Sequence, residues 1–251
     1  MLSVVIRTKN EEQNIERAIR SLMELAQEII VVDSGSEDRT VDIAKSLGAK
    51  VYFKEWEGYA NQLNYGISLC SGDWVLVIDA DEEVSDRLRE SIKKELQNPK
   101  YDVYMLCRRT YYLGAFLNHA WYPEWRVRLF KKGKVRFEGK LHEKAIFEGK
   151  AGKLQGDLYH YSFESLYDQY IKTVDYAKKM AYIMKEEGRS FKLYNLLFNP
   201  FWHFVKVYFL QLGFMDGIRG LFVASSSFIY AFLKYKFLYE LELSEKEGRL
   251  W

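Results

Sequence analysis

The chain has 251 residues, of which 48% are hydrophobic and 29% charged, and its formal net charge is +2. This length suits one sizeable α/β core with an appendage. The net charge is too small to indicate a nucleic-acid partner, so none is expected. The two cysteines, Cys70 and Cys107, show neither metal-ligand spacing nor a disulfide framework, which favours a reducing compartment.

The chain starts on a strand pattern rather than on a leader. Leu2–Ile6 is apolar, and Arg7 and Lys9 follow this run instead of preceding it, which is not the pattern of a signal peptide. No uninterrupted apolar stretch reaches the roughly 18 residues of a typical membrane span, so a conventional span is not expected.

Short apolar runs alternate with helical patterns over the first 110 residues. The runs predict strands at residues 2–6, 28–32, 50–53, 74–78 and 102–106. Apolar residues at helical spacing predict helices at about residues 15–23, 41–47, 58–69 and 88–96. This alternation predicts right-handed βαβ units, and therefore an α/β fold with a Rossmann-like, mostly parallel central sheet.

The most informative run is Trp74–Ile78, which leads directly into Asp79, Asp81, Glu82 and Glu83. Such a run suits a strand buried on both faces, with its acids at the carboxyl end, where open α/β sheets bind ligands. Asp79 and Asp81 are two residues apart, so their carboxylates would point the same way and form part of a shell for a divalent cation. The alternative is the acidic first turn of a helix, which suits Glu82 and Glu83 better than Asp79.

The turns after the first two strands also carry polar side chains. Arg7–Glu12 has no glycine, so it is neither a dinucleotide fingerprint nor a P-loop, and side chains would contact any ligand there. Asn10 has the alternative of capping the next helix. Asp33 ends the second strand, where doubly wound folds read a ribose or base. Asn61 and Asn64 share one face of the 58–69 helix, either near the ligand or exposed to solvent.

Four motifs follow one another in the first third of the chain. They are Thr8-Lys9-Asn10-Glu11, then Val32–Ser36 with Asp38 and Thr40, then Asn64 with Gly66, and finally Gly72-Asp73 with Asp79-Ala80-Asp81. In combination they resemble the family 2 glycosyltransferases, which are inverting enzymes with a GT-A fold. Later segments resemble the bacterial subgroup that adds sugars to the lipopolysaccharide inner core; these are Trp121-Tyr122-Pro123, Arg126–Phe130, His142-Glu143 and Gly213–Gly217.

The resemblance implies a donor site for a nucleotide-sugar such as a UDP-sugar. It implies that Asp33 contacts the nucleobase or ribose, that Asp79 and Asp81 lie at the ribose and at a metal-bridged diphosphate, and that the remaining motif residues Thr8, Asn10, Glu11 and Asn64 line the same site. Mg²⁺ or Mn²⁺ would stabilise the leaving nucleoside diphosphate.

The resemblance also bears on the catalytic base. Many family members end the catalytic domain with a glutamate-aspartate pair that supplies it, whereas this chain has His142-Glu143 at the comparable place. Glu143 is therefore the predicted base, with Glu138 and Glu124 in reserve. An inverting transfer needs only one such carboxylate, because it has no covalent intermediate.

Residues 111–160 are predicted to form loops and short strands. Trp121 belongs to an aromatic cluster that would stack on a sugar or pack at a core edge. Arg126 and Arg128 alternate on a predicted strand, where they would bind a phosphate of the donor or acceptor or remain as solvated edge charges. His142 would orient the base, bind phosphate or be structural, and His160 would complete the metal shell begun by Asp81.

The C-terminal third changes character. Residues 162–187 predict an amphipathic helix. Residues 189–239 contain six Lys or Arg, one acid (Asp216) and sixteen aromatic residues, which favours a helical region lying on a membrane surface. The apolar run Leu221–Leu233 is too short to span a bilayer. The alternatives are an oligomer interface or a helical cover over the sheet.

The sequence thus predicts a GT-A catalytic domain at residues 1–161 and a helical, membrane-associated extension at residues 162–251. The predicted function is metal-assisted, inverting transfer from a nucleotide-sugar to a saccharide or lipid-linked acceptor such as the lipopolysaccharide core, on the cytoplasmic face of the cytoplasmic membrane. The alternatives are a phosphohydrolase of the haloacid dehalogenase type and a non-catalytic, membrane-associated nucleotide-sugar-binding protein.

Overall fold

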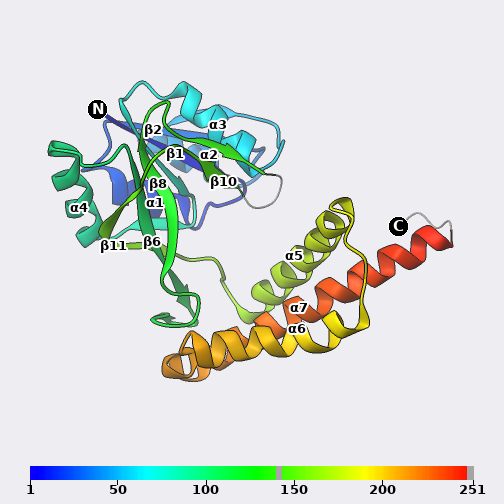
Figure 1. Cartoon of the computed structure of the whole chain (residues 1–251). Helices are drawn as coiled ribbons and strands as arrows, with labels where there is room; N and C mark the ends of the chain where they lie inside the picture. Colours follow the sequence, from blue (N-terminus) through cyan, green and yellow to red (C-terminus); the bar gives the residue numbers. More distant parts are fainter. Residues whose placement is uncertain (140–142, 248–251) are drawn as a thin grey trace. The chain divides into compact units, whose positions relative to one another are not determined.

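The structure is a computed structural model that describes residues 1–139 and 143–247 (Figure 1). The chain divides into two compact units. Unit 1 comprises Met1–Arg109 and Glu124–Tyr161, and unit 2 comprises Thr110–Pro123 and Ser162–Trp251.

Unit 1 is built on a mixed sheet with helices on both faces. The sheet contains β1 (Leu2–Thr8), β2 (Glu28–Asp33), β3 (Lys50–Phe53), β4 (Trp74–Asp79), β5 (Glu82–Val84), β6 (Val103–Tyr112), β8 (Glu124–Lys131) and β11 (Gly152–His160). A separate antiparallel pair is formed by β9 (Arg136–Glu138) and β10 (Lys144–Ile146). The helices of unit 1 are α1 (Ile15–Leu22), α2 (Thr40–Ser46), α3 (Tyr59–Leu69) and α4 (Asp86–Gln97).

The strand order is β3-β2-β1-β4-β8-β6-β11-β5. The first four strands are parallel, and each crossover between them carries a helix, as the alternating pattern predicts. Strand β8 pairs antiparallel with both β4 and β6, and β11 pairs antiparallel with β5. The parallel half thus brings the carboxyl ends of β1, β2 and β4 to one edge.

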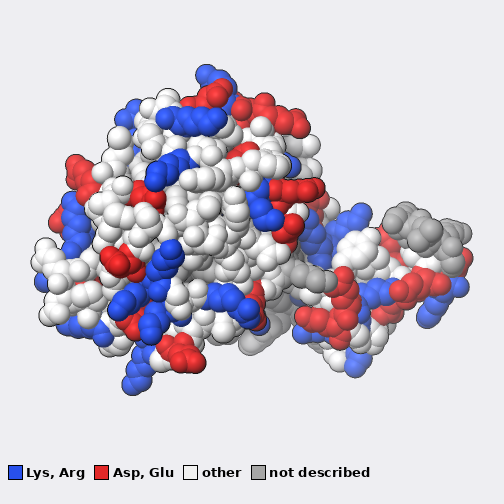
Figure 2. All heavy atoms as spheres, turned by 90° about the horizontal axis from the view of Figure 1, so that it is seen from above, with Lys and Arg blue, Asp and Glu red and all other residues white. Residues whose placement is uncertain are grey.

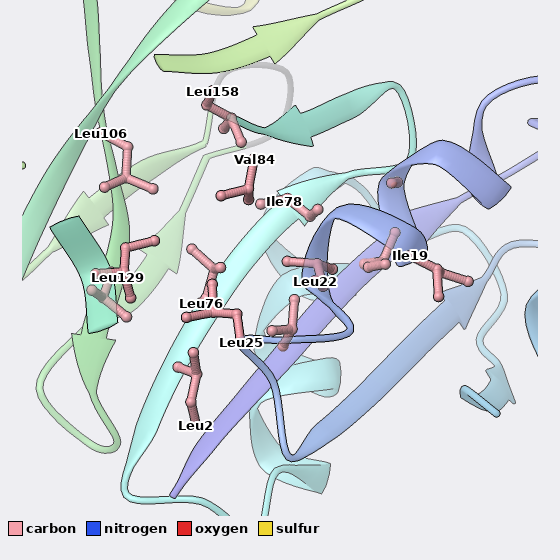
Figure 3. Packing of buried hydrophobic residues seen from close by; sticks show 14 of the residues in the cluster. Leu2, Ile19, Leu22, Leu25, Leu76, Ile78, Val84, Leu106, Leu129 and Leu158 are labelled. Atoms are coloured by element: carbon pink, nitrogen blue, oxygen red, sulfur yellow. The ribbon is translucent and has the colours of Figure 1, made fainter. Parts of the chain in front are cut away.

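The central strands are buried on both faces because their apolar residues alternate between two cores. Leu76 and Ile78 of β4 pack toward α1 and α4, where Figure 3 shows them beside Leu22 and Val84. Val75 and Val77 face the other way, into the core that contains Leu63 and Ile67 of α3. Gly66 lets α3 lie close to the sheet, since a Cβ there would come within 2.4 Å of Val5 Cγ1.

Two local expectations are wrong. Glu82 and Glu83 do not begin a helix, because they belong to β5, and α4 begins only after Ser85, whose Oγ accepts a hydrogen bond from the Leu88 N–H. The 111–160 segment also contains more than short strands. β8 and β11 have eight and nine residues and take part in the main sheet.

Unit 2 is helical apart from the hairpin formed by β7 (Ala115–Phe116) with the end of β6. Its helices are α5 (Leu166–Glu186), α6 (Leu193–Val205), the π-helix η1 (Lys206–Leu210), the 3₁₀ helix η2 (Gly213–Asp216) and α7 (Gly217–Lys246) (Figure 1). A buried hydrogen-bond chain ties the hairpin to two helices, because Tyr112 donates to Gln169 over 2.6 Å and Gln169 donates to Ser226 over 2.9 Å.

Residues 110–123 belong to unit 2, although the sequence groups them with residues 1–161. The reason is packing. Leu117 and Ala120 bury their side chains in one cluster with Val207, Val223 and Ala224 of the C-terminal helices.

Basic and acidic side chains are interspersed over the face shown in Figure 2, which fits the net charge of +2. By length and composition alone, one described helical segment, Gly213–Lys246, is long and apolar enough to cross a membrane. Both cysteines are buried.

Candidate active site

The candidate site begins where three parallel strands end side by side. In the sheet register Thr8 of β1 lies opposite Asp33 of β2, and Arg7 lies opposite Asp79 of β4. This edge is where open α/β sheets bind ligands. The sequence motifs that ended these strands are therefore adjacent in space.

The loops after β1 and β2 are fastened to each other by hydrogen bonds. The Asn10 N–H donates to Ser36 Oγ over 2.8 Å, and Asn10 Oδ1 accepts from the Glu37 N–H over 2.9 Å. The Glu11 N–H donates to Thr40 Oγ1 over 2.8 Å. Asn10 does not cap α1, because this helix begins only at Ile15, five residues after Asn10. Its observed contacts fix the two loops relative to each other.

Asp33 organises the turn that follows it. Its carboxylate accepts hydrogen bonds from the N–H groups of Gly35 and Ser36 and from Ser36 Oγ, over 2.5 to 3.3 Å. Gly35 has a φ of 90°, which suits glycine in this tight turn. Asp33 thus lies at the strand end where it was predicted, and it is only 5% exposed.

A buried network of arginines and carboxylates lies next to this edge. We call it the arginine–carboxylate network; its members are Arg7, Arg108, Arg128, Asp79, Glu82, Glu124 and Glu143. Arg7 makes a bidentate ion pair with Asp79, and its Nη2 also donates to Glu143 Oε1 over 3.0 Å. Arg7 therefore joins the predicted base to the first aspartate of the Asp79-Ala80-Asp81 motif.

Arg128 forms the second centre of the network. Its Nη2 donates to Asp79 Oδ2 over 3.0 Å and to Glu82 Oε1 over 2.9 Å. Arg108 continues the chain, with its Nη1 3.6 Å from Glu82 Oε1 and its Nε donating to Glu124 Oε2 over 2.7 Å. Glu82 Oε2 also accepts from the Asp79 N–H over 2.9 Å, so it holds the backbone of the motif.

The network controls the ionisation of its acids. Burial alone would raise the pKa of Asp79, but the charges of Arg7 and Arg128 outweigh it and hold that pKa well below its usual range. Burial likewise opposes ionisation of Glu124, yet Arg108 and Arg126 lower its pKa to about 2. Burial raises the pKa of Glu82 in spite of Arg128.

Three buried polar atoms beside the network have no hydrogen-bond partner among the residues that the structure describes. They are Arg7 Nη1, Thr8 Oγ1 and Arg128 Nε. Two of them are N–H donors on cations, and an unpaired buried donor of this kind costs free energy. The site thus retains donor capacity suited to an anion.

Asp81 and His160 meet as the sequence predicts for a metal site. Asp81 Oδ2 lies 3.2 Å from His160 Nε2, and this contact outweighs burial and lowers the pKa of Asp81. Within residues 1–139 and 143–247, no group of three or more His, Cys, Asp or Glu could hold a metal ion. The pair still fits Mg²⁺ or Mn²⁺, because such ions take few protein ligands when substrate phosphates and waters fill the shell.

Other predicted residues have different surroundings. Asn64 bonds the backbone of Phe137 on β9 through both its amide atoms, over 2.8 and 3.0 Å. Arg126 pairs with Glu124 two residues away, and Glu138 pairs with Arg136. Glu143 and Asp79 both bond to Arg7. The alternative bases Glu124 and Glu138 share no arginine with Asp79 among these contacts.

Two predicted residues cannot be placed at this edge. Trp121 belongs to unit 2, where its ring packs against Tyr112 and Phe163 with centroids 6.5 and 6.1 Å apart. His142 lies outside the described residues.

Glu82, Arg7 and Arg108 were not predicted as site residues. The sequence contained one indication that Glu82 is buried. Glu82 and Val84 are two residues apart, and residues at this spacing on a strand share a face. Both are buried, so a strand assignment for residues 82–84 would have pointed Glu82 inward. Arg7 was noted only as part of the glycine-free turn Arg7–Glu12, and Arg108 gave no signal, because the partners of both come from distant parts of the chain.

The chain also resembles known proteins. Residues 3–149 match the family model described as glycosyl transferase family 2. An uncharacterized glycosyltransferase of Rickettsia typhi is 36% identical and covers 98% of this chain and 89% of its own length. The lipopolysaccharide core biosynthesis glycosyltransferase LpsC of Rhizobium meliloti is 32% identical over 95% of this chain and 92% of its own length.

Among solved structures, glucosyl-3-phosphoglycerate synthase from Mycobacterium tuberculosis, in complex with Mn²⁺ and UDP-glucose, is 28% identical and covers 44% of each chain with a TM-score of 0.38. A likeness of this extent adds nothing to the family match. That match spans more than half of the 251 residues, and two relatives align over nearly the whole chain. This α/β, GT-A-class protein belongs to glycosyltransferase family 2.

Proposed function

We propose that this glycosyltransferase moves a sugar from a nucleotide-sugar, a UDP-sugar in the first instance, to a saccharide or lipid-linked acceptor with inversion at the anomeric carbon. Residues 1–161 would supply the chemistry, and residues 162–251 would associate with the membrane surface. The family assignment favours this reaction over a phosphohydrolase of the haloacid dehalogenase type.

The observation that carries the proposal is the unused donor capacity beside Asp79. Arg7 Nη1 and Arg128 Nε are buried and unpaired within the described chain, at the carboxyl edge of the parallel strands. A diphosphate supplies oxygen acceptors that match guanidinium groups. Thr8 Oγ1 would add a third hydrogen bond from the same edge. Asp33, Asn10, Glu11 and Asn64 would shape the nucleoside end of this donor site, either by contact or by fixing its loops.

The proposed base is Glu143. In a single displacement, the acceptor hydroxyl oxygen forms a bond to the anomeric carbon while the bond from that carbon to the phosphate oxygen breaks. Glu143 takes the hydroxyl proton, and the nucleoside diphosphate leaves with the bonding electrons. Its contact with Arg7 supports this role, because it holds the carboxylate near the diphosphate-binding arginines. Arg126, His142 and Trp121 remain candidate acceptor or phosphate contacts.

Asp81 and His160 would hold a divalent ion, Mg²⁺ or Mn²⁺. When bound, such an ion would stabilise the negative charge of the departing diphosphate. Asp79 is less suited as a direct ligand, because both its oxygens accept hydrogen bonds from Arg7 and Arg128. We therefore assign Asp79 to organising the arginines and the ribose end of the donor.

The name of the Rhizobium meliloti relative supports a lipopolysaccharide core acceptor. A core acceptor carries a lipid, so the enzyme would work at the cytoplasmic face of the cytoplasmic membrane. The exposed apolar residues of unit 2 are consistent with this location.

The test is a panel of nucleotide-sugars incubated with the full chain, with and without Mg²⁺ or Mn²⁺, followed by measurement of released nucleoside diphosphate. We expect turnover of at least one donor, and its loss on chelation of the metal. Binding without any turnover, including in the presence of core oligosaccharide acceptors, would favour a non-catalytic nucleotide-sugar-binding protein. Release of inorganic phosphate from simple phosphomonoesters would favour the phosphohydrolase.

A further inference from the structure

Helix α6 carries its apolar stripe on the outside of unit 2. Seven of its 13 residues are large, apolar and exposed, and they recur at helical spacing: Leu193, Tyr194, Leu197, Phe198, Phe201, Trp202 and Val205. Phe198 and Phe201 are 68% and 64% exposed. A helix of a water-soluble domain normally points such a stripe inward.

The inward side of α6 is the more polar one. Asn199 donates a 2.6 Å hydrogen bond to the Tyr235 hydroxyl of α7, and Asn195 and His203 are also less exposed than the stripe. Burial lowers the pKa of His203 and so favours its neutral form. Pro200 is buried on this side. Leu196 and Phe204 also pack inward, so α6 is apolar on both sides and carries its polar residues on the inner one.

The exposed apolar surface continues beyond α6 through the turn that joins it to α7. Phe209, Leu210, Leu212, Phe214, Met215 and Ile218 are 43% to 63% exposed. We call the exposed apolar residues between positions 193 and 218 the apolar rim.

The turn beneath the apolar rim is built tightly. A Cβ on Gly220 would come within 1.7 Å of the Gly213 carbonyl oxygen, so the two backbones are in direct contact. The Asp216 carboxylate accepts hydrogen bonds from the N–H groups of Asn118, His119 and Ala120, over 2.8 to 3.0 Å. The exposed side chains are therefore presented by a fixed backbone.

The charged residues in the stretch of chain that carries the apolar rim are almost all basic. Asp216 is the one acid between Arg189 and Tyr239, and its side chain is only 4% exposed. Six basic residues lie in the same interval: Arg189, Lys192, Lys206, Arg219, Lys234 and Lys236. Lys192 and Lys206, at the two ends of α6, are exposed. A surface that is apolar, contains Tyr194 and Trp202, and is flanked by cationic residues complements an anionic lipid headgroup layer.

The same surroundings argue against a membrane span. Helix α6 has 13 residues, about 20 Å, whereas a bilayer core is about 30 Å thick. Helix α7 is longer, but it packs against α5. Gln169 bonds Ser226, and Lys185 donates to the Leu241 carbonyl and pairs with Glu245. Helix α5 has seven charged residues in its 21, which would be costly to place in hydrocarbon.

We propose that the apolar rim inserts in the plane of an anionic bilayer, at the level of the headgroups, and holds the enzyme on the surface where a lipid-linked acceptor is found. The inference rests on the proposed function only for the identity of that acceptor. The proposed binding partner of the apolar rim is the bilayer and not a second copy of the chain.

The experiment is co-sedimentation of the full chain with phosphatidylglycerol-rich vesicles and with phosphatidylcholine vesicles. We expect binding to the anionic vesicles, weaker binding to the neutral ones, and release by an alkaline carbonate wash. The double variant Phe198→Ser with Trp202→Ser should lose about tenfold or more of the vesicle affinity. The matched control is Tyr167→Ser with Ile171→Ser on α5, which removes two similarly exposed apolar side chains and should bind as the wild type does.

Several results would overturn the proposal. They are no binding of the wild type to anionic vesicles, equal losses in the two double variants, or retention after the carbonate wash, which would indicate a span. A wild-type dimer that the Phe198 and Trp202 substitutions dissociate, without vesicle binding, would assign the surface to a second copy. Calorimetric titration with UDP and Mn²⁺ separates this test from the proposed function. The variant should bind UDP as the wild type does, and vesicle binding without donor turnover would overturn the proposed function alone.

Discussion

The two units of this protein depart from ordinary soluble packing in opposite directions. Unit 1 buries charges: the Arg128 side chain is 5% exposed, and Glu82 is buried between it and Arg108. Unit 2 exposes apolar groups, such as Phe198 at 68% and Trp202 at 56%, and buries its acid Asp216. Both arrangements are expensive for a chain that needs only to fold, since each buried ion costs several kcal/mol and a large apolar patch invites association.

What the comparison teaches is where to look for function. Natural sequences follow hydrophobic patterning closely and depart from it mainly at functional sites. In unit 1 the departure is a set of guanidinium groups with unused donors, which suits an anionic donor substrate. In unit 2 it is a helix with an exposed apolar face and basic residues at both ends, which suits a lipid surface.

The largest effect is expected from Glu143→Gln. Removal of the base should lower kcat about 10²- to 10⁴-fold, the range typical of general base catalysis. The amide can still accept the hydrogen bond from Arg7, so donor binding should change little. Steady-state kinetics with separate donor-binding measurements check this. A kcat close to that of the wild type would move the base elsewhere, first to Glu138 or Glu124.

Glu82→Ala should damage folding rather than binding alone. It leaves Arg128 and Arg108 without a buried partner and removes the acceptor of the Asp79 N–H, so we expect a loss of about 3–5 kcal/mol in the free energy of unfolding. Chemical denaturation measures it. Glu16→Ala is the control, because its exposed pair with Arg20 on one helix face is worth less than about 1 kcal/mol. Equal losses in the two variants would show that the buried network contributes little stability.

Asp216→Asn tests the buried acid of unit 2. An amide has one acceptor oxygen for the three N–H groups that the carboxylate now binds, so the unfolding free energy should fall by about 1–3 kcal/mol. The control is Asp175→Asn on the exposed side of α5, which should leave the Tm unchanged. If the two variants melt together, Asp216 does not fasten the turn under the apolar rim.

The smallest effect is expected from Arg126→Ala. Its guanidinium is half-exposed and pairs with Glu124, so the unfolding free energy should change by less than about 1 kcal/mol. A rise in the KM of donor or acceptor, at unchanged stability, would identify Arg126 as a substrate contact. Unchanged kinetics would restrict the phosphate-binding role to the buried arginines.

Local patterning predicted much of unit 1. The apolar runs that end at Asp33 and Asp79 are strands β2 and β4, and their parallel pairing with β1 follows from the alternation with helices. The proximity of Asp81 and His160 was also predicted, although 79 positions separate them in sequence. Asp81 follows β4 and His160 ends β11 of the same sheet, and their role as metal ligands stays a prediction.

The arginine–carboxylate network could not be predicted in the same way. Its ion pairs join residues on β1, β4, β5, β6 and β8 and the segment before β10, and such long-range pairings leave no periodic signal. The assignment of Glu82 failed for a further reason, since an acid after a strand also suits the start of a helix. The apolar rim was visible as composition, but only the structure gives the direction in which its stripe faces.

The contact between Gly213 and Gly220 has a consequence for how this protein can vary. Membrane insertion of the apolar rim requires only that its side chains be hydrophobic, so substitutions such as Phe214→Leu or Met215→Ile should be tolerated. The two glycines have no such freedom, because a methyl group on Gly220 would overlap the Gly213 carbonyl oxygen, and one on Gly213 would come within 2.7 Å of the Val207 carbonyl oxygen. In a saturation library over residues 207–220, selected for vesicle binding, we therefore expect many hydrophobic residues to be accepted at the exposed positions and only glycine at positions 213 and 220.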